Sequence, residues 1–499
     1  MKPARVVSVP VLLLVTALVF PFVAALAMTK GLNHDENQHV AAGAMVARGL
    51  LPYRDFPHFH TPYLAFIYAA LFHVTDHLLL AARLFGAVCA SAMAGLVGSV
   101  GYALFRERGK RWAAGAGAGA VVLCLTAGLF GQTVGHAWNH EPSLLFALLA
   151  FVAHVAGLGR QRSGWLVASG ALLGVAIGTR LTFAPLVAPF AVALLFYTPL
   201  QPRLLLSFAG GLLLGSVGLG VIFALAPEQT FFGTFEFAKV NVAYLDERAM
   251  TLPNKLGYLM KVIALREVAL LAAAVLPLIA AHLAKGRLRF EARFILLLLP
   301  FLLWGSLAPS PLHYQYFFPF VPFLILVGLY ALASIPPETR WFTRALTAGV
   351  AAVALSAAVG SRVYLRLHDQ LAVAGWTPLA VHREALNLRA HVPAGRVLTF
   401  APVFPLEAGL AIYPPFTTGL FAWRVSPQVE PGKAARLGMP TPATLAARLD
   451  AEPPAAFLLG YESTESDFKE YAKAHAYRPE PLDGRTLWLA PEKHPTEVK

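Results

Sequence analysis

The chain has 499 residues, of which 57% are hydrophobic and only 13% are charged, and its mean hydropathy is +0.61. A soluble domain carries about a quarter charged residues, so this composition excludes a soluble globular protein and predicts a mainly α, polytopic helical membrane protein. The net charge of +13 does not indicate nucleic-acid binding, which needs a basic soluble face. Residues 366–499 form the main polar part, and they hold 14 basic and 14 acidic residues.

Apolar runs predict about eleven transmembrane helices. If the N-terminus is cytoplasmic, the inner loops hold 15 basic and three acidic residues, as the positive-inside rule requires. This asymmetry predicts a multi-pass protein of the inner (plasma) membrane. A cleaved signal peptide is the alternative interpretation of the first run. The runs lie at residues 6–28, 78–105, 112–134, 142–158, 165–178, 181–197, 204–225, 267–283, 294–307, 316–334 and 344–364.

The residue patterns divide the chain into two domains. Residues 1–365 are expected to form the transmembrane domain, with a first extracytoplasmic loop at 29–77. Residues 366–499 are expected to form a small extracytoplasmic α/β domain. Its helices are predicted near 376–392, 441–452 and 465–476, and its strands near 395–402, 455–460 and 485–491.

A long loop rich in proline and aromatic residues is predicted at 402–431, after the first of these strands. Long loops in compact domains are often binding elements. The alternative is a linker that packs on the membrane surface.

Titratable residues concentrate in a polar segment at residues 30–62, just after the first span. Such a density predicts a reaction site at the bilayer surface, with an ordinary solvated loop as the alternative. The apolar segment that follows, residues 61–76, is short for a span and predicts a helix in the outer interface. Adjacent carboxylates, Asp35 and Glu36, open the polar segment, and Tyr53, Arg54, Asp55, His58 and His60 close it.

Other polar residues repeat this pattern at the expected outer boundary. His140 and Glu141 begin the fourth span, and His313 and Tyr316 lie near the start of the tenth. Arg180 is a lone cation between two short apolar runs, where a charge is costly unless it has a partner.

Structural explanations exist for two of these charges. An acid at a helix start, such as Glu141, is favoured by the helix dipole. Arg180 could form a structural pair with Asp35, Glu141 or Glu267.

In this order, the motifs resemble the GT-C class of integral-membrane glycosyltransferases, in the branch of the protein O-mannosyltransferases, lipid A aminoarabinose transferases and lipopolysaccharide-core transferases. The resemblance covers roughly residues 6–335. The chain departs from the family pattern at Glu36, where many relatives have Asp, and at His60, where many have Lys. The matching stretches are DENQHVAAGAMVARGLLPYRDFPHFHTP (35–62), HEPSL (140–144), GVAIGTRLTFAPL (174–186) and PLHYQYFFPFVPF (311–323).

The resemblance implies a GT-C fold and the transfer of a sugar from a polyprenyl-phosphate-linked donor to an acceptor hydroxyl, with inversion, at the extracytoplasmic face. The acceptor would be a lipid, a cell-envelope glycan or a protein. Membrane lipids would be further partners, and nucleic acid would not.

Roles for individual residues follow from the same resemblance. Asp35 is expected to be the general base, with Glu36 as the second candidate. Glu141 would orient the acceptor or position a divalent ion near Asp35. This ion is the one cofactor considered. The leaving phosphate would be held by His60, Arg180, His313 and Tyr316; the further site candidates are Tyr53, Arg54, Asp55, His58 and His140.

Two other functions fit parts of the sequence. A transporter or flippase of lipid-linked sugars would place its ionisable residues at mid-membrane, whereas here they gather at the outer boundary. A metal transporter or zinc enzyme would use the outer histidines, because His136 and His140 have the i,i+4 spacing of metal ligands. The HExxH pattern is absent, however.

Overall fold

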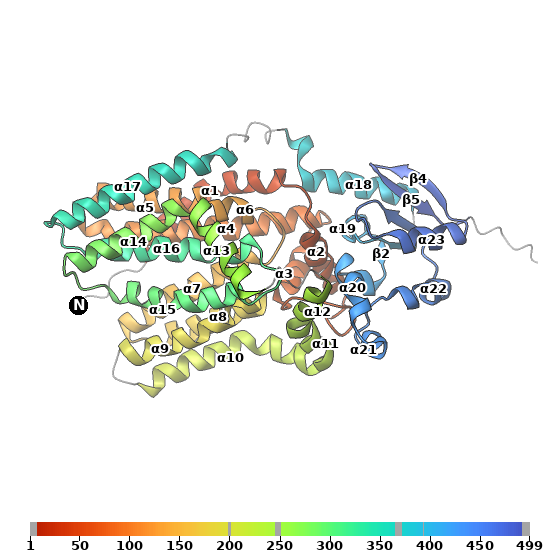
Figure 1. The fold of residues 1–499 in the computed structure, drawn as a ribbon, viewed down its shortest axis with the longest axis horizontal. Coiled ribbons are helices and arrows are strands. Elements are labelled where there is room, and N and C mark those ends of the chain that lie inside the picture. The colour runs from red at the N-terminus through yellow and green to blue at the C-terminus, as the bar shows by residue number, and fades with distance from the viewer. Residues whose placement is uncertain (1–6, 198–200, 245–250, 365–371, 393, 492–499) are drawn as a thin grey trace, which may run out of the picture.

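The computed structural model describes residues 7–197, 201–244, 251–364, 372–392 and 394–491. A bundle of long helices makes up one part of the molecule, and a small sheet with its own helices lies at one end of the bundle (Figure 1). The predicted mainly helical fold with a small C-terminal α/β region is confirmed. The predicted domain boundary at residues 365/366 lies outside the described residues.

Each of the eleven apolar runs coincides with a helix. By length and composition, seven helices of the described residues could cross a membrane; three of them continue from or into a short 3₁₀ helix, η1 (Arg106–Arg108), η5 (Tyr314–Phe317) or η6 (Ser361–Tyr364). The exact number of spans remains a prediction. The seven are α1 (Val9–Thr29), α4 (Leu78–Phe105), α7 (His140–Arg160), α10 (Pro202–Leu225), α15 (Phe290–Leu307), α16 (Phe320–Ala333) and α17 (Arg340–Gly360); the remaining runs form α5 (Lys110–Thr126), α8 (Ser163–Thr179), α9 (Val187–Tyr197) and α14 (Val268–Leu283).

The helical structure is interrupted at Arg180, between the two short apolar runs at 165–178 and 181–197. Helix α8 ends at Thr179, and Arg180 has an extended backbone with φ −155° and ψ 115°. The 3₁₀ helix η2 (Leu181–Leu186) follows and contains Pro185, which has no N–H to donate to a continuing α-helix. The break leaves the Arg180 side chain at a helix end instead of in the middle of a span.

The polar segment after α1 is partly helical, which the prediction of a loop did not include. Helix α2 (His34–Ala47) starts at a capping box: the Asn33 side chain accepts the Asp35 N–H, and the Glu36 carboxylate accepts the Asn33 N–H. Helix α3 (Tyr63–Phe72) then forms within the segment predicted as an interfacial helix.

Glycines allow α8 and α10 to approach closely. A Cβ atom at Gly211 would lie 2.1 Å from the Val167 carbonyl oxygen, and one at Gly215 would lie 2.1 Å from that of Ala171. Only glycine fits at such backbone-to-backbone contacts. These residues are therefore packing positions and not part of a phosphate-binding loop.

Short helices connect the bundle to the C-terminal region. Helix α6 (Gly128–Thr133) precedes α7, while α11 (Pro227–Phe231), the π-helix η3 (Phe232–Glu236) and α12 (Phe237–Tyr244) follow α10. Helix α13 (Leu252–Arg266) leads to α14. Figure 1 shows α2, α11, α12 and α20 (Leu420–Val425) between the bundle and the sheet.

The C-terminal region contains a five-stranded mixed sheet in the order β2-β1-β3-β5-β4. Strand β1 pairs in parallel with β2 and β3, whereas β5 is antiparallel to β3 and β4. The predicted helices and strands are found, and β2 and β4 are additional. The strands are β1 (Arg396–Leu398), β2 (Ala411–Ile412), β3 (Ala456–Leu459), β4 (Arg478–Leu482) and β5 (Arg485–Leu489), and the main helices are α18 (Thr377–His391), α22 (Pro442–Ala451) and α23 (Ser466–Ala474).

The prediction of a structureless loop at 402–431 is wrong. The segment folds into short helices around β2, because its aromatic and aliphatic side chains pack into the cores on both faces of the sheet. Strand β4, with two prolines, escaped prediction; it is an edge strand, where proline is tolerated. The short helices are α19 (Val403–Glu407), η9 (Pro414–Phe416), α20, η10 (Ser426–Gln428) and α21 (Pro431–Arg436), and η8 (Val373–Gly375) precedes α18.

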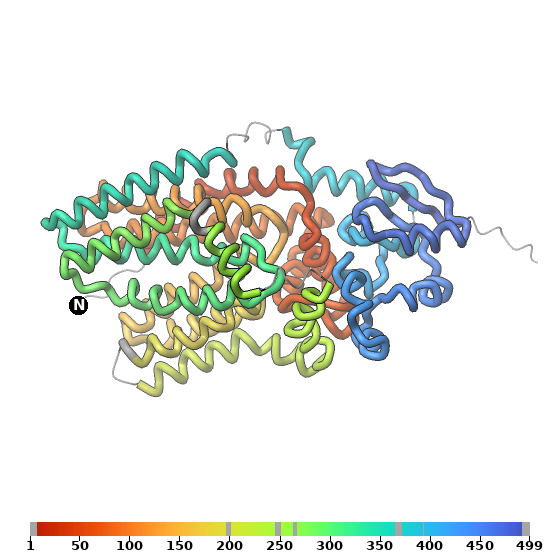
Figure 2. The backbone as a smooth tube through the Cα atoms, in the orientation of Figure 1, coloured from red at the N-terminus to blue at the C-terminus, as the bar shows by residue number. Residues whose placement is uncertain are grey.

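One face of the sheet shares its hydrophobic core with the helices near the membrane part. Ala456 and Leu458 of β3 face a cluster that also contains Val40 of α2 and Leu79 of α4, whereas Phe457 and its neighbours pack under α22 and α23 on the other face. Segments far apart in sequence, such as α2 and α19, therefore lie side by side (Figure 2).

The close packing of α8 and α10 gives a paired prediction. Gly211→Ala should lower the free energy of unfolding by about 1–3 kcal/mol, because the methyl group overpacks the helix contact. Gly210→Ala is the matched control, since no heavy atom lies within 4 Å of the point that its added methyl group would occupy, and it should be neutral or slightly stabilising. Heat-induced unfolding of the purified variants in detergent measures both, and equal midpoints would contradict the packing.

Candidate active site

A buried ion pair between Arg83 and Glu36 fixes the start of α2. Arg83 Nε and Nη2 donate to the two Glu36 carboxylate oxygens at 2.8 and 2.7 Å, and both side chains are fully buried. Arg83 also donates to the carbonyls of Ala27, Lys30 and Gly31 at 2.7–2.9 Å. These bonds use all five guanidinium donors and satisfy carbonyls at the C-terminal end of α1.

The remaining acceptor positions of Glu36 are also occupied. Its oxygens accept the N–H groups of Asn33 at 2.9 Å and Ala137 at 2.7 Å, and His136 Nδ1 lies 3.3 Å away. Burial raises the pKa of Glu36, but Arg83 and the hydrogen bond from His136 overcome that effect and lower it to about 2. A carboxylate held in this way is a structural anchor, which argues against the predicted role of Glu36 as a base.

Asp35 lies beside Glu36 on α2 but has a different environment. Its side chain is partly exposed, and one carboxylate oxygen accepts a hydrogen bond from Gln38 Nε2 at 3.0 Å. The surrounding protein desolvates the carboxylate and raises its pKa, an effect that His313 and Gln38 partly offset. Asp35 is therefore the acid of the pair that can accept a proton from a bound molecule.

Arg180 contacts polar side chains at the start of α7 and in the segment after α8. Its Nη1 donates to Asn139 Oδ1 at 3.0 Å and lies 2.8 Å from the His140 ring, and its Nε donates to Thr182 Oγ1 at 2.9 Å. The guanidinium stands 4.9 Å from the centre of the Tyr316 ring. Among the described residues, no carboxylate forms an ion pair with Arg180, so a structural pair with Asp35, Glu141 or Glu267 is not formed.

Four histidines and a tyrosine surround this arginine. The His313 ring is nearly perpendicular to the Tyr316 ring, with 5.5 Å between the ring centres. The His140 ring stacks on the Tyr316 ring, with 6.1 Å between the centres. His39 and His60 form a ring pair at 4.6 Å. Together with Arg180 we call these residues the basic cluster: His39, His60, His140, Arg180, His313 and Tyr316.

Burial keeps two of these histidines neutral. Together with the nearby His58 and Arg180, it lowers the pKa of His60 to about 3, while the pKa of His39 falls well below its usual value through burial and the neighbouring His60. The positive charge of the basic cluster therefore resides mainly on Arg180. His39 and His60 act as hydrogen-bonding groups at neutral pH.

Glu141 is fully buried at the start of α7, where one oxygen accepts the Gly135 N–H at 3.2 Å. Neither Asp35 nor Glu141 belongs to a group of three close metal-binding side chains among the described residues. A divalent ion near these two acids stays a prediction.

Other predicted candidates lie in a turn beside the basic cluster. Arg54 and Asp55 form an ion pair with each other at 2.7–2.9 Å, and Asp55 also accepts the Leu51 N–H. Tyr53, with a φ of 67°, donates to the His60 carbonyl, and its ring packs edge-on against His58. The turn shapes the backbone that carries His60, and its side chains have structural roles.

Two residues of this region escaped prediction. Arg83 is a lone cation in an apolar run, the same signal that singled out Arg180. Arg424 of α20 comes from the C-terminal region, donates to Asn241 Oδ1 at 2.7 Å and offsets the raised pKa of Asp35. No sequence signal placed Arg424 near Asp35, because 389 positions separate them along the chain.

A cavity lined mainly by apolar residues lies elsewhere in the molecule. It has a volume of about 610 Å³ and is lined by apolar residues of α5, α14, α16 and α17, among them Trp112, Pro277 and Val353. None of the residues of the basic cluster lines it.

Comparison with known proteins supports the expected class. Residues 59–226 match the family described as dolichyl-phosphate-mannose-protein mannosyltransferase. No curated protein matches the sequence.

Solved structures are similar over almost the whole chain. The fold resembles ArnT from Cupriavidus metallidurans bound to undecaprenyl phosphate, with 14% identity over 97% of this chain and 98% of ArnT and a TM-score of 0.58. For ArnT from Cupriavidus metallidurans in the apo state, the identity is 14%, the alignment covers 96% of this chain and 97% of ArnT, and the TM-score is 0.59. The apo oligosaccharyltransferase of Archaeoglobus fulgidus gives 12% identity, coverage of 92% of this chain and 71% of that one, and a TM-score of 0.51. The GT-C fold and the resemblance to GT-C class membrane glycosyltransferases are thereby confirmed.

The environment of Glu36 leads to a prediction about stability. Glu36→Gln should destabilise the fold by about 3–5 kcal/mol, because it leaves the Arg83 charge buried without its partner. The wild-type pair should also weaken in acid: the pKa of Glu36 is lowered from 4.5 to about 2, so its contribution is lost as the pH falls from about 4.5 toward 2. Unfolding in detergent across this pH range tests both effects.

The double variant Glu36→Gln/Arg83→Met is the control, since it removes both charges. It should recover part of the lost stability. If Glu36→Gln unfolds like the wild type yet abolishes activity, Glu36 is a catalytic residue and the structural assignment is wrong.

Proposed function

We propose that this protein transfers a sugar from a polyprenyl-phosphate-linked donor to an acceptor hydroxyl on the extracytoplasmic side of the membrane. The observation that carries the proposal is the arrangement of two groups: Asp35, a partly exposed carboxylate, and Arg180, a buried cation that forms no ion pair with a described carboxylate and is influenced by Asp35 and Glu141 only at longer range. The solved ArnT complex contains undecaprenyl phosphate, a lipid of the class proposed here as the carrier.

Asp35 is the proposed general base. An acceptor hydroxyl becomes a nucleophile when a carboxylate within hydrogen-bond reach removes its proton, which accelerates a reaction by about 10²–10⁴-fold. The raised pKa of Asp35 makes it a stronger base than an ordinary aspartate, whereas the anchored Glu36 is a weaker one. Attack by the acceptor and departure of the lipid phosphate in one displacement would invert the anomeric carbon.

The basic cluster is the proposed site for the leaving phosphate. Arg180 would supply the positive charge, which interacts more strongly as negative charge develops on the departing phosphate. Neutral His60, together with Tyr316 and His313, would donate hydrogen bonds. An anionic phosphate would also provide a direct ion-pair partner for Arg180, which Asp35 and Glu141 influence only at longer range.

The orientation of the chain is part of the proposal. With a cytoplasmic N-terminus, the basic cluster and the C-terminal region would both be extracytoplasmic, in the inner (plasma) membrane. The clustering of α2, α20 and their neighbours at one end of the bundle supports a reaction at a membrane surface (Figure 1). This clustering favours sugar transfer over the flippase alternative, because a flippase needs ionisable groups along a substrate path through the membrane.

The alternative function as a metal transporter or zinc enzyme required His136 and His140 as a pair of metal ligands, and these two side chains face different partners. His136 Nδ1 faces Glu36 at 3.3 Å, and the His140 ring faces Arg180 at 2.8 Å, with Trp138 between the two rings. The His136 and His140 rings therefore do not form an i,i+4 metal site in this arrangement, because each contacts a different charged residue.

Replacement of Asp35 tests the base. Asp35→Asn should fold normally and reduce kcat by at least about 100-fold in an assay with purified protein and a labelled polyprenyl-phosphate sugar. In the wild type, activity should fall as the pH drops through the pKa of Asp35, which lies above the usual 3.8, because the protonated acid cannot accept the hydroxyl proton.

Asp483→Asn provides the matched control, because Asp483 is exposed in a turn of the C-terminal sheet and accepts a bond from Asn387. It should retain full activity. A turnover of more than a few per cent in Asp35→Asn would show that another group is the base.

Replacement of Arg180 tests the phosphate site. Arg180→Ala should weaken binding of undecaprenyl phosphate by about 10- to 100-fold and also slow turnover, since a hydrogen bond to a charged group contributes about 1.5–3 kcal/mol. Arg180→Lys should restore the charge but only part of the activity, because it lacks the planar fork.

Arg160→Ala, which removes an exposed cation at the other end of α7, controls for the loss of charge. It should leave lipid binding unchanged. If Arg180→Ala lowers the unfolding midpoint while the folded fraction binds the lipid phosphate as tightly as the wild type, Arg180 has a structural role and the phosphate assignment fails.

A further inference from the structure

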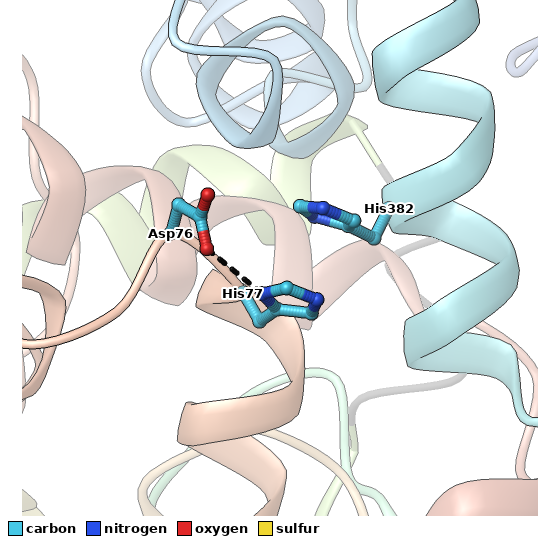
Figure 3. Close-up of side chains that lie close together, drawn as sticks. All are labelled: Asp76, His77 and His382. Atoms are coloured by element: carbon cyan, nitrogen blue, oxygen red, sulfur yellow. Dashed lines mark hydrogen bonds and ion pairs between the residues drawn. The ribbon is translucent and has the colours of Figure 1, made fainter.

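Three side chains of types that can bind metal ions lie close together where the C-terminal region contacts the helix bundle. Asp76 and His77 lie immediately before α4, and His382 lies on α18 (Figure 3). The His77 and His382 rings are 3.7 Å apart and nearly parallel, and Asp76 Oδ1 lies 2.8 Å from His77 Nδ1. One ligand atom from each residue lies within 4.8 Å of the others.

His382 is oriented by a carboxylate behind it. Its Nδ1 lies 3.1 Å from Glu407 Oε1, and the second oxygen of this buried glutamate accepts the Leu79 N–H in the first turn of α4 at 3.1 Å. Metal-binding histidines commonly donate one ring N–H to a carboxylate, which fixes the tautomer and leaves the other nitrogen for the ion. Since Nδ1 faces Glu407, Nε2 is the His382 nitrogen that is left for an ion.

We propose that Asp76, His77 and His382 bind a divalent ion of the Zn²⁺ type, with water as the fourth ligand. Two imidazoles and a carboxylate are an ordinary ligand set for zinc. The proposal goes beyond sugar transfer and does not depend on it, because none of the three residues belongs to the basic cluster.

The side chains have to rearrange to reach an ion, chiefly at His77 and Asp76. Two ligand atoms about 2.1 Å from a tetrahedral zinc lie about 3.4 Å apart, so the group has to contract slightly. The stacked rings must also turn so that both nitrogens point at one ion. Asp76 and His77 can make this adjustment, since their side chains are 81% and 37% exposed, whereas His382 is held by the protein around it.

Such an ion would join two parts of the chain. His77 directly precedes α4, the helix that carries Arg83, and His382 lies on α18, which packs with α19. The ion would therefore hold the C-terminal region against the helix that anchors α2. Zinc binding should stabilise this docking by mass action.

Metal titration of the purified full-length protein in detergent tests the site. After chelator treatment, ZnCl₂ is titrated in competition with a chromophoric chelator, and we expect one saturable equivalent. His77→Ala and His382→Ala should each weaken binding at least tenfold, and Glu407→Gln should weaken it about 10- to 100-fold. Zinc should raise the unfolding midpoint of the wild type but not of the two histidine variants.

Two exposed histidines near the site provide matched controls. His73→Ala, just before Asp76, and His391→Ala, at the end of α18, should bind zinc like the wild type. His77→Gln and Asp76→Ala test the site at its exposed side, should His382→Ala fail to fold. Each should bind zinc at least tenfold more weakly than the wild type.

Three results would overturn the proposal. They are the absence of a saturable zinc equivalent, undiminished binding in the His77 and His382 variants, and loss of zinc in His39→Ala or His60→Ala instead. The last result would place the ion in the basic cluster.

Discussion

The arrangement of the candidate site depends on one buried ion pair. Arg83 and Glu36 are both removed from solvent, so each group must find all its hydrogen bonds inside the protein. They do so by joining the end of α1, the start of α2, α4 and the segment before α7. Because a mispaired charge in this position would be very costly, the position and direction of α2 are fixed.

This anchoring separates the roles of two adjacent acids. Consecutive residues on a helix point in directions about 100° apart, so Glu36 faces Arg83 while Asp35 faces a partly open region near His313. The pKa of the first falls and that of the second rises. Adjacent carboxylates whose environments shift their pKa values in opposite directions can take different roles.

The C-terminal region is integrated into this arrangement. Its sheet shares a hydrophobic core with α2 and α4, and Arg424 from α20 reaches the electrostatic surroundings of Asp35. The site is therefore assembled from segments that span most of the chain. A change in the docking of the sheet would alter the charge around Asp35 as well as the packing against α4.

The class of fold follows from the amino-acid sequence alone. The backbone groups of long apolar runs are hydrogen-bonded when the runs form buried or lipid-facing helices. The density of titratable groups singled out Asp35 as a site candidate, and isolation between two apolar runs singled out Arg180. Local chemistry could not distinguish Asp35 from Glu36, since both are acids in the same helical turn. Their separate roles emerge only in the folded chain, because Arg83 is 47 positions from Glu36 and Arg424 is 389 positions from Asp35. The free energy that separates an anchored carboxylate from a reactive one comes from such distant partners and their desolvation.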